Sequence, residues 1–173
     1  MPVAAGTTKP DWKGRLKALL PLFGHRNWIV IADAAYPAQS GAGIETIVAG
    51  GSPIQATRTV LDAIAAIKHV RANIYLDQEL EFVADADAPG VSRYRAQLSE
   101  LLNSAKPITL PHDQIIARLG DAALAFRVLV IKTELSIPYT TIFLELDCGY
   151  WSAEVEQRLR RAMAASAKKS KGR

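Results

Sequence analysis

The sequence has one cysteine among its 173 residues and no long apolar run. Cys148 cannot form an internal disulfide, which is typical of a reducing compartment. No segment reaches the roughly 18 apolar residues that a membrane span requires. The first residues lack the basic and apolar regions of a secretory signal. We therefore expect a cytoplasmic protein that does not associate with a membrane.

The common motifs for metals and nucleotides are also missing. The three histidines lie far apart, and a lone cysteine offers no pair, so nothing local supports a zinc site. Residues 40–46 resemble a dinucleotide-binding loop only superficially, because Thr46 stands where the third glycine belongs and no helix follows directly. The sequence has no Walker lysine. We expect neither a metal nor a cofactor.

The positive charge of the chain is concentrated at its C-terminal end. The net charge is +4, but residues 158–173 contain seven basic residues and no acidic one, so the rest of the chain carries −3. The small and basic residues 166–173 predict a disordered, solubilising tail. The alternative is a phosphate-binding arm for nucleic acid. Because a basic stripe with stacking aromatics is missing, we expect no nucleic-acid partner.

Apolar runs of strand length alternate with amphipathic helical patterns along the chain. Strands separated by helices form a mostly parallel sheet covered on both faces, so the pattern predicts an α/β fold. The expected domain spans residues 11–165, between a flexible N-terminus at 1–10 and the tail. The expected helices cover residues 12–23, 55–70, 92–102, 112–119 and 152–165, and the expected strands 28–32, 44–49, 74–76, 80–83, 108–110, 126–132 and 140–146.

Two groups able to exchange protons frame the first strand. His25 precedes the five apolar residues 28–32, and Asp33 follows them at the carboxyl end, where open α/β sheets bind ligands. If the preceding loop folds back, the imidazole and the carboxylate form a general acid/base pair. The alternatives are structural: His25 hydrogen-bonds within its loop, and Asp33 ends the strand in an Asx turn.

This framed strand resembles a family signature. Gly24-His25, the apolar strand and the segment from Asp33 to Pro37 resemble the RbsD/FucU family, the ribose pyranases and fucose mutarotases. Two more blocks resemble the family in the same order: Pro111-His112-Asp113-Gln114, and residues 130–142. The resemblance covers residues 16–149 and implies a single RbsD-like three-layer αβα domain.

The resemblance also implies an activity, an assembly and a site. It implies a cofactor-independent isomerase, a mutarotase or pyranase that interconverts anomers or ring forms of a fucose-like or ribose-like monosaccharide. The catalytic pair is His25, as proton donor, and Asp33. The assembly is a homo-oligomer, possibly a decamer, with sites at subunit interfaces. The implied substrate-binding residues are His112, Tyr139, Thr140, Thr141, Lys132 and Glu134.

The chemistry agrees with these residue types. Opening a hemiacetal ring puts a proton on the ring oxygen and removes one from the anomeric hydroxyl, and histidine exchanges protons near neutral pH. Thr141 stands where the family has asparagine, and Thr133 where it has a turn glycine. These departures leave a second hypothesis open, an inactive sugar-binding or regulatory module. His112 has a structural alternative, capping of the helix after Pro111.

Overall fold

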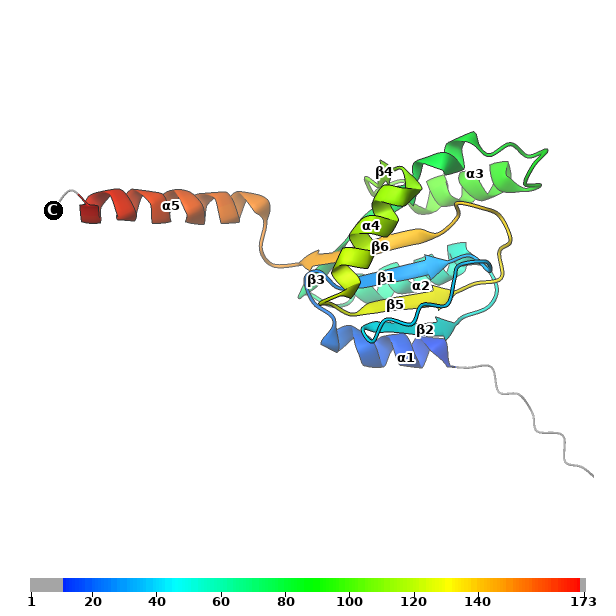
Figure 1. Ribbon diagram of the computed structural model, residues 1–173, viewed down its shortest axis with the longest axis horizontal. Coiled ribbons are helices and arrows are strands. Elements are labelled where there is room, and N and C mark those ends of the chain that lie inside the picture. The colour runs from blue at the N-terminus through cyan, green and yellow to red at the C-terminus, as the bar shows by residue number, and fades with distance from the viewer. Residues whose placement is uncertain (1–10, 172–173) are drawn as a thin grey trace, which may run out of the picture.

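The computed structural model describes residues 11–171 (Figure 1). The expected flexible segment 1–10 lies outside the described residues, as do the last two residues of the expected tail. In chain order the elements are α1 (Trp12–Leu19), the 3₁₀ helix η1 (Leu20–Leu22), β1 (Trp28–Ala32), β2 (Ile44–Val48), α2 (Pro53–Ala65), β3 (Val70–Asp77), the 3₁₀ helix η2 (Gln78–Phe82), α3 (Val91–Leu101), β4 (Ile108–Leu110), α4 (His112–Ala123), β5 (Val128–Lys132), β6 (Ile142–Cys148) and α5 (Ala153–Lys171).

The six strands form one mostly parallel sheet in the order β2-β5-β1-β6-β3-β4. β6 runs antiparallel to both of its neighbours, β1 and β3, and the other pairs are parallel. The predicted α/β class with a mostly parallel sheet is confirmed. Because β6 is reversed, its amino end meets the carboxyl ends of β1 and β3 at one edge of the sheet.

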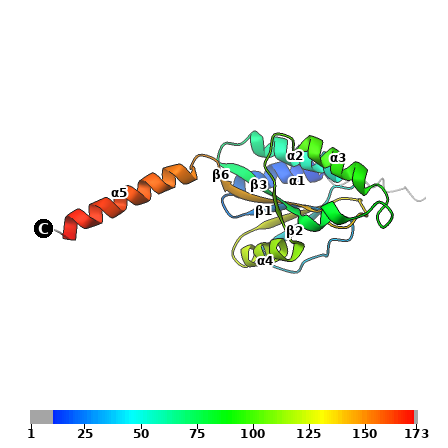
Figure 2. The same ribbon diagram turned by 90° about the horizontal axis from the view of Figure 1, so that it is seen from above.

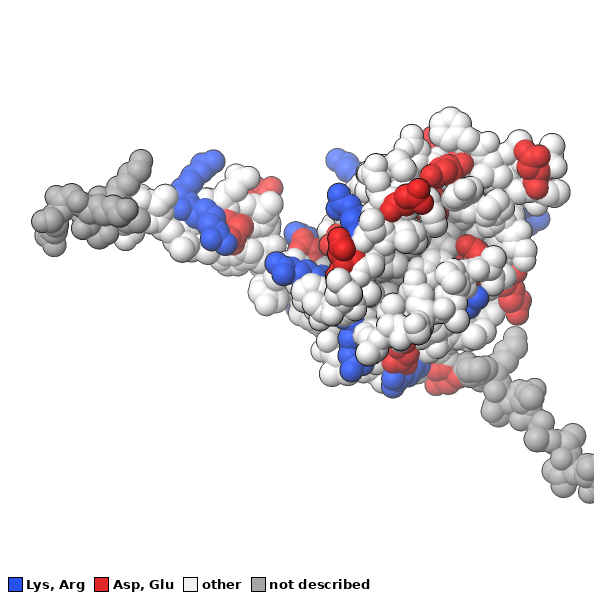
Figure 3. Space-filling model, viewed as in Figure 1, with Lys and Arg blue, Asp and Glu red and all other residues white. Residues whose placement is uncertain are grey.

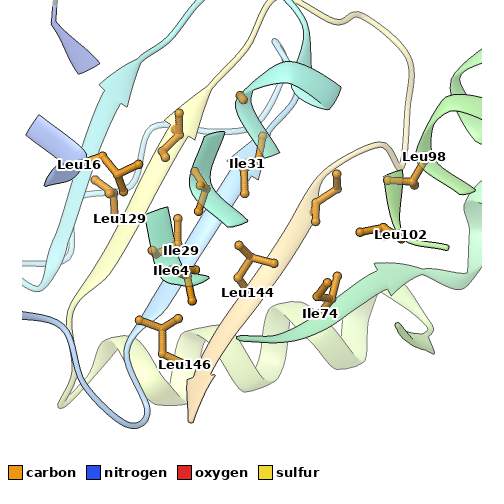
Figure 4. Close-up of a cluster of buried hydrophobic side chains, with 14 of the residues drawn as sticks. Leu16, Ile29, Ile31, Ile64, Ile74, Leu98, Leu102, Leu129, Leu144 and Leu146 are labelled. Carbon is orange, nitrogen blue, oxygen red and sulfur yellow. The ribbon is translucent and has the colours of Figure 1, made fainter. Parts of the chain in front are cut away.

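Helices cover both faces of the sheet, as the α/β pattern predicts. α1, α2 and α3 lie on one side and α4 on the other (Figure 2). Alternate residues of β1 face the two layers: Ile29 and Ile31 pack with Leu16 and Ile64 in the larger core (Figure 4), whereas Val30 packs toward α4. All five residues of β1 are buried. Since each fully buried aliphatic side chain contributes about 1.5–3 kcal/mol, β1 is the central stabilising element.

The N-terminal helix begins at the expected residue 12 but ends before the expected residue 23. The Asp11 carboxylate caps it, accepting a hydrogen bond from the Gly14 backbone N–H at 2.8 Å. The regular α-helix stops at Leu19, and Pro21 lies in the 3₁₀ turn that follows. Proline lacks the backbone donor that a longer α-helix would need.

The prediction of a strand at residues 80–83 is wrong. The segment forms η2, and the Arg95 guanidinium donates to the carbonyl oxygens of Leu80 and Val83 at 2.9 and 2.8 Å. A side chain from α3 therefore satisfies carbonyls that a neighbouring strand would otherwise bind.

The helix expected over residues 92–102 starts at Ser92, a residue type that favours the N-cap, but Ser92 does not cap the helix. α3 begins at Val91, and the N-cap position belongs to Gly90, whose φ of 93° favours glycine. Ser92 lies inside the first turn, where its hydroxyl and backbone N–H both bond to the Asp85 carboxylate. The side-chain bond from Ser92 is the largest cause that lowers the pKa of Asp85.

The helix expected over residues 55–70 is shorter than predicted. α2 ends at Ala65, and Val70 already belongs to β3. His69 therefore lies beyond the end of this helix. Its Nε2 is 2.9 Å from the carbonyl oxygen of Phe23.

The C-terminal helix projects from the sheet and its covering layers (Figures 1 and 2). Residues 166–171, which we expected to be disordered, continue α5 as a helix, because alanine and lysine are good helix formers. Leu159 and Met163 on this helix are exposed. On the face seen in Figure 3, both the described part of α5 and the body carry basic and acidic side chains side by side.

Candidate functional site

A cavity of about 350 Å³ opens where the carboxyl ends of β1 and β3 meet the amino end of β6. This edge is where ligands bind in open α/β sheets. Side chains from four parts of the chain line it, including Asp33, Tyr36, Asp77, His112, Tyr139 and Thr141. Four residues that the sequence predicts for the site thus lie together here.

Asp33 is held by the chain that ends β1. One carboxylate oxygen accepts from the Ala35 backbone N–H at 2.8 Å, and the other from the Thr141 hydroxyl at 2.9 Å. The Thr141 oxygen also accepts from the Asp33 backbone N–H at 3.3 Å. Asp33 therefore does form an Asx turn, and it is at the same time fixed at the wall of the cavity.

His112 begins α4 directly after Pro111. Its backbone N–H donates to both carboxylate oxygens of Glu79 at 3.0 Å, so Glu79 caps the helix. The His112 imidazole contacts the Tyr139 ring edge-on, with ring centroids 5.7 Å apart. The side chain of His112 is thus free of a capping role and lines the cavity.

Asp77 is a site residue that the sequence analysis did not identify. It ends β3, and only 2% of its surface is exposed. Its Oδ2 lies 3.1 Å from Nδ1 of His112, although the two groups are not aligned as a hydrogen bond. Burial raises the pKa of Asp77 to about 6; the charges of Glu79 and Asp33 add to this rise, and His112 opposes it. The sequence did contain a signal for Asp77: it directly follows the apolar residues 74–76, just as Asp33 follows the apolar residues 28–32.

Tyr36 supplies a buried phenol beside the two carboxylates. Burial raises its pKa to about 12, with smaller contributions in the same direction from Asp33 and Asp77 and an opposing one from Gln39. Its hydroxyl therefore stays protonated at neutral pH and can donate a hydrogen bond.

The loop before β6 presents Tyr139 in a left-handed conformation, with φ at 59°. This conformation is uncommon for a bulky residue and needs support from its surroundings. Thr140 gives that support: its buried hydroxyl donates to the Ile137 carbonyl at 2.7 Å, and the carbonyl of Thr140 accepts from the Tyr94 hydroxyl at 2.8 Å. Thr140 therefore holds the loop, and Tyr139 is 39% exposed at the cavity.

Lys132 and Glu134 lie apart from the other predicted binding residues. Nζ of Lys132 donates to the carbonyl oxygen of Tyr36 at 2.7 Å. This bond holds the backbone of Tyr36, which lines the cavity, but Lys132 is not itself among the lining residues. Glu134 borders a separate hollow beside Gly51 at the start of α2.

His25 and Asp33 lie at opposite ends of β1 within one chain. The five residues of the strand, at about 3.3 Å each, separate them. The His25 side chain is 57% exposed, and its Nε2 lies 3.6 Å from Oδ1 of Asp147. The preceding loop does not fold back, so the structure does not bring these two residues into one crevice of the same chain.

Asp147 at that end is itself held by Arg71, whose guanidinium donates to Oδ2 at 2.5 and 3.0 Å. Burial alone would raise the pKa of Asp147. The hydrogen bonds from Arg71 and from the Cys148 backbone, together with the charges of Arg71 and His25, outweigh burial and lower it. His25 therefore faces an ionised carboxylate on an open surface.

Neither a metal cluster nor a membrane span occurs within the described part of the chain. Residues 11–171 contain no group of three or more His, Cys, Asp or Glu side chains arranged to hold a metal ion. Over the same range, no helix is both long and apolar enough to cross a membrane.

Comparison with known proteins places the chain in a family. Residues 12–148 match the RbsD / FucU transport protein family, and the protein belongs to it. The match contains all six strands and ends before α5. No curated protein sequence matches the chain significantly.

Solved structures of the family share the fold at low sequence identity. RbsD from Bacillus subtilis, solved in complex with D-ribose, has 18% identity and a TM-score of 0.53 over 77% of this chain and 91% of its own. FucU from Bifidobacterium longum has 19% identity and a TM-score of 0.52, covering 78% and 94%. The fucose mutarotase from Streptococcus pneumoniae, in complex with L-fucose, has 18% identity and a TM-score of 0.51, covering 80% and 91%.

Proposed function

We propose that the protein is a monosaccharide mutarotase or pyranase. The observation that carries this proposal is the cavity in which Asp33, His112, Tyr139 and Thr141 converge. Its volume of about 350 Å³ lies at the lower end of the range for small-molecule sites. The relatives solved with D-ribose and L-fucose support a monosaccharide as the ligand.

The residues of the cavity suit a polyhydroxylated ligand. The Asp33 carboxylate accepts hydrogen bonds from hydroxyl groups, and the protonated Tyr36 phenol donates one. The exposed ring of Tyr139 offers an apolar face against which the C–H face of a sugar ring packs. These groups bind a neutral sugar without a metal or a second substrate.

Ring opening and closure need one proton donor and one acceptor. We propose that Asp33 takes the proton of the anomeric hydroxyl while the anomeric carbon–oxygen bond to the ring breaks. His25 of a neighbouring subunit then gives the ring oxygen its proton. The exposure of His25 at the far end of β1 supports a role across an interface, as the assembly of the family implies.

A sugar-binding module without turnover is the second candidate. It is favoured by Thr141, because the single hydroxyl of this side chain is already bonded to Asp33 and has no further proton to donate to a sugar. Thr140 supports the loop, and Lys132 lies outside the lining. In this proposal the cavity binds the sugar, but no anomer exchange follows.

NMR exchange spectroscopy on anomeric mixtures of D-ribose, L-fucose and other aldoses separates the two candidates. A mutarotase increases the intensity of exchange cross-peaks between the forms of one sugar, and Asp33→Asn removes the increase. A binding module broadens the NMR lines of a sugar, but the sugar's forms interconvert no faster than they do in buffer. If no sugar shows exchange or broadening, both candidates are wrong.

A further inference from the structure

We propose that Asp77 positions His112, fixing the imidazole so that Nδ1 carries the proton and Nε2 accepts a hydrogen bond from a hydroxyl of the ligand. This inference rests on the proposed sugar site. It assigns to Asp77 a role that acts through His112 and that governs how strongly the site binds.

The burial of Asp77 is the first argument. A carboxylate with 2% exposure normally has hydrogen-bond partners, because an unpaired buried charge is costly. Neither oxygen of Asp77 has an aligned partner within the described residues. The Nδ1 atom of His112 lies 3.1 Å from Oδ2, within hydrogen-bonding distance, and is itself buried without another partner in that part of the chain.

The second argument is that the rest of His112 is fixed without Asp77. Glu79 binds its backbone N–H, and the Tyr139 ring lies against the imidazole edge-on. These contacts set where the ring lies but do not select which nitrogen carries the proton. Asp77 is the acceptor beside Nδ1, and a carboxylate acceptor selects the tautomer with the proton on Nδ1.

The exposed part of the ring then determines the consequence. Nδ1 is buried, whereas 35% of the His112 side chain is exposed. Nε2 is left without a proton and without a partner among the described residues, so it accepts from a hydroxyl. Asp33 also accepts and Tyr36 donates, so the site would recognise a ligand by two acceptors and one donor.

The tautomer of His112 is directly measurable by long-range ¹H–¹⁵N correlation spectra of ¹⁵N-histidine-labelled protein above neutral pH. The chain has three histidines, and the signals missing from His112→Gln assign this one. We expect a protonated Nδ1 in the wild type and a shift toward protonated Nε2 in Asp77→Asn. Asp33→Asn is the matched control, because it removes a carboxylate from the same cavity without touching Nδ1, and it leaves the tautomer unchanged.

Sugar titration completes the test. Asp77→Asn weakens the binding of the sugar that the wild type exchanges by about tenfold, as expected for the loss of one hydrogen bond. A wild-type His112 protonated on Nε2, or a tautomer that Asp77→Asn does not alter, overturns the inference. If the wild type binds no sugar, the proposed function fails, and the tautomer alone then decides whether Asp77 orients His112.

Discussion

The two ends of β1 differ in how they hold their functional side chains. At the carboxyl end, Asp33 and His112 line a cavity whose deepest carboxylate, Asp77, is almost completely buried. At the amino end, His25 and Asp147 lie on an open surface, with the histidine 57% exposed. Both ends pair an imidazole with a carboxylate, but the contact distance is 3.1 Å in the cavity and 3.6 Å on the surface.

This difference indicates that the two ends of β1 have different roles. The cavity has the walls and the preorganised acceptors that a small ligand needs. The open end has a group able to donate a proton but no enclosure, so it can act only where another surface faces it. We therefore propose that the carboxyl end is the binding site and that the amino end contributes His25 to the site of a neighbouring subunit.

The largest expected effect comes from Asp33→Asn. The amide cannot take the proton of the anomeric hydroxyl, so anomer exchange should fall on the order of 10²–10⁴-fold. The amide also has one acceptor oxygen where the carboxylate has two, which now accept separately from the Ala35 N–H and the Thr141 hydroxyl. The exchange rate measured by NMR is the readout. The control is Asp113→Asn, an exposed carboxylate on the first turn of α4, which keeps the wild-type rate. Wild-type exchange in Asp33→Asn would contradict the assignment of the site.

A smaller loss of exchange is expected from His25→Ala. Removing the proton donor should slow exchange by about 10–10²-fold, whereas sugar affinity changes little because the cavity is intact. Asp147→Asn is a milder variant, because it removes only the carboxylate near His25. We expect it to lose less of the exchange rate than His25→Ala. A large fall in affinity with unchanged turnover would show that His25 binds the sugar instead.

Asp77→Asn should change stability in the direction opposite to most buried substitutions. The folded pKa of about 6 lies above the ordinary value of 3.8, so the folded state loses stability as pH rises from about 4 to 6. The amide removes this loss and should raise the free energy of unfolding by about 1–3 kcal/mol at pH 8. Urea unfolding should show the gain disappearing at pH 4. A variant less stable than wild type at pH 8 would contradict a destabilising charge on Asp77.

Removal of residues 153–173 should have the smallest effect. α5 projects from the layers that form the cavity, and the family match ends before it. We expect wild-type sugar exchange, and stability within about 0.5 kcal/mol. A loss of exchange would instead show that α5 holds the assembly in which the cavity works. A loss of salt-dependent binding to DNA would support the nucleic-acid hypothesis for the basic end.

The sequence predicts the fold well because β1 and β5 are buried on both faces and their apolar runs are unmistakable. It also predicts Asp33, which follows such a run. Asp77 was missed because Gln78 and Glu79 continue the polar segment. Asp77 pairs with Leu110 of β4 and contacts His112 of α4, and both partners are remote in the sequence, so the local pattern does not reveal its burial.

Two other predictions failed because distant residues determine the outcome. Arg95 binds the carbonyls of the segment that was predicted as a strand near Leu80, which is therefore η2. The local sequence around His25 shows that it precedes β1. It does not show in which direction the loop that carries His25 runs. Only the structure shows that this loop leaves His25 near Asp147.

Co-assembly of Asp33→Asn and His25→Ala subunits tests the central claim most directly. Each variant alone keeps at most about a tenth of the wild-type rate, but an oligomer mixed in equal amounts contains some cavities with an intact Asp33 facing an intact His25 from a neighbour. We predict that sugar exchange recovers to about a quarter of the wild-type rate for random pairing of subunits. If mixing gives no more than the sum of the two variants, the two ends of β1 do not meet across subunits, and the claim is wrong.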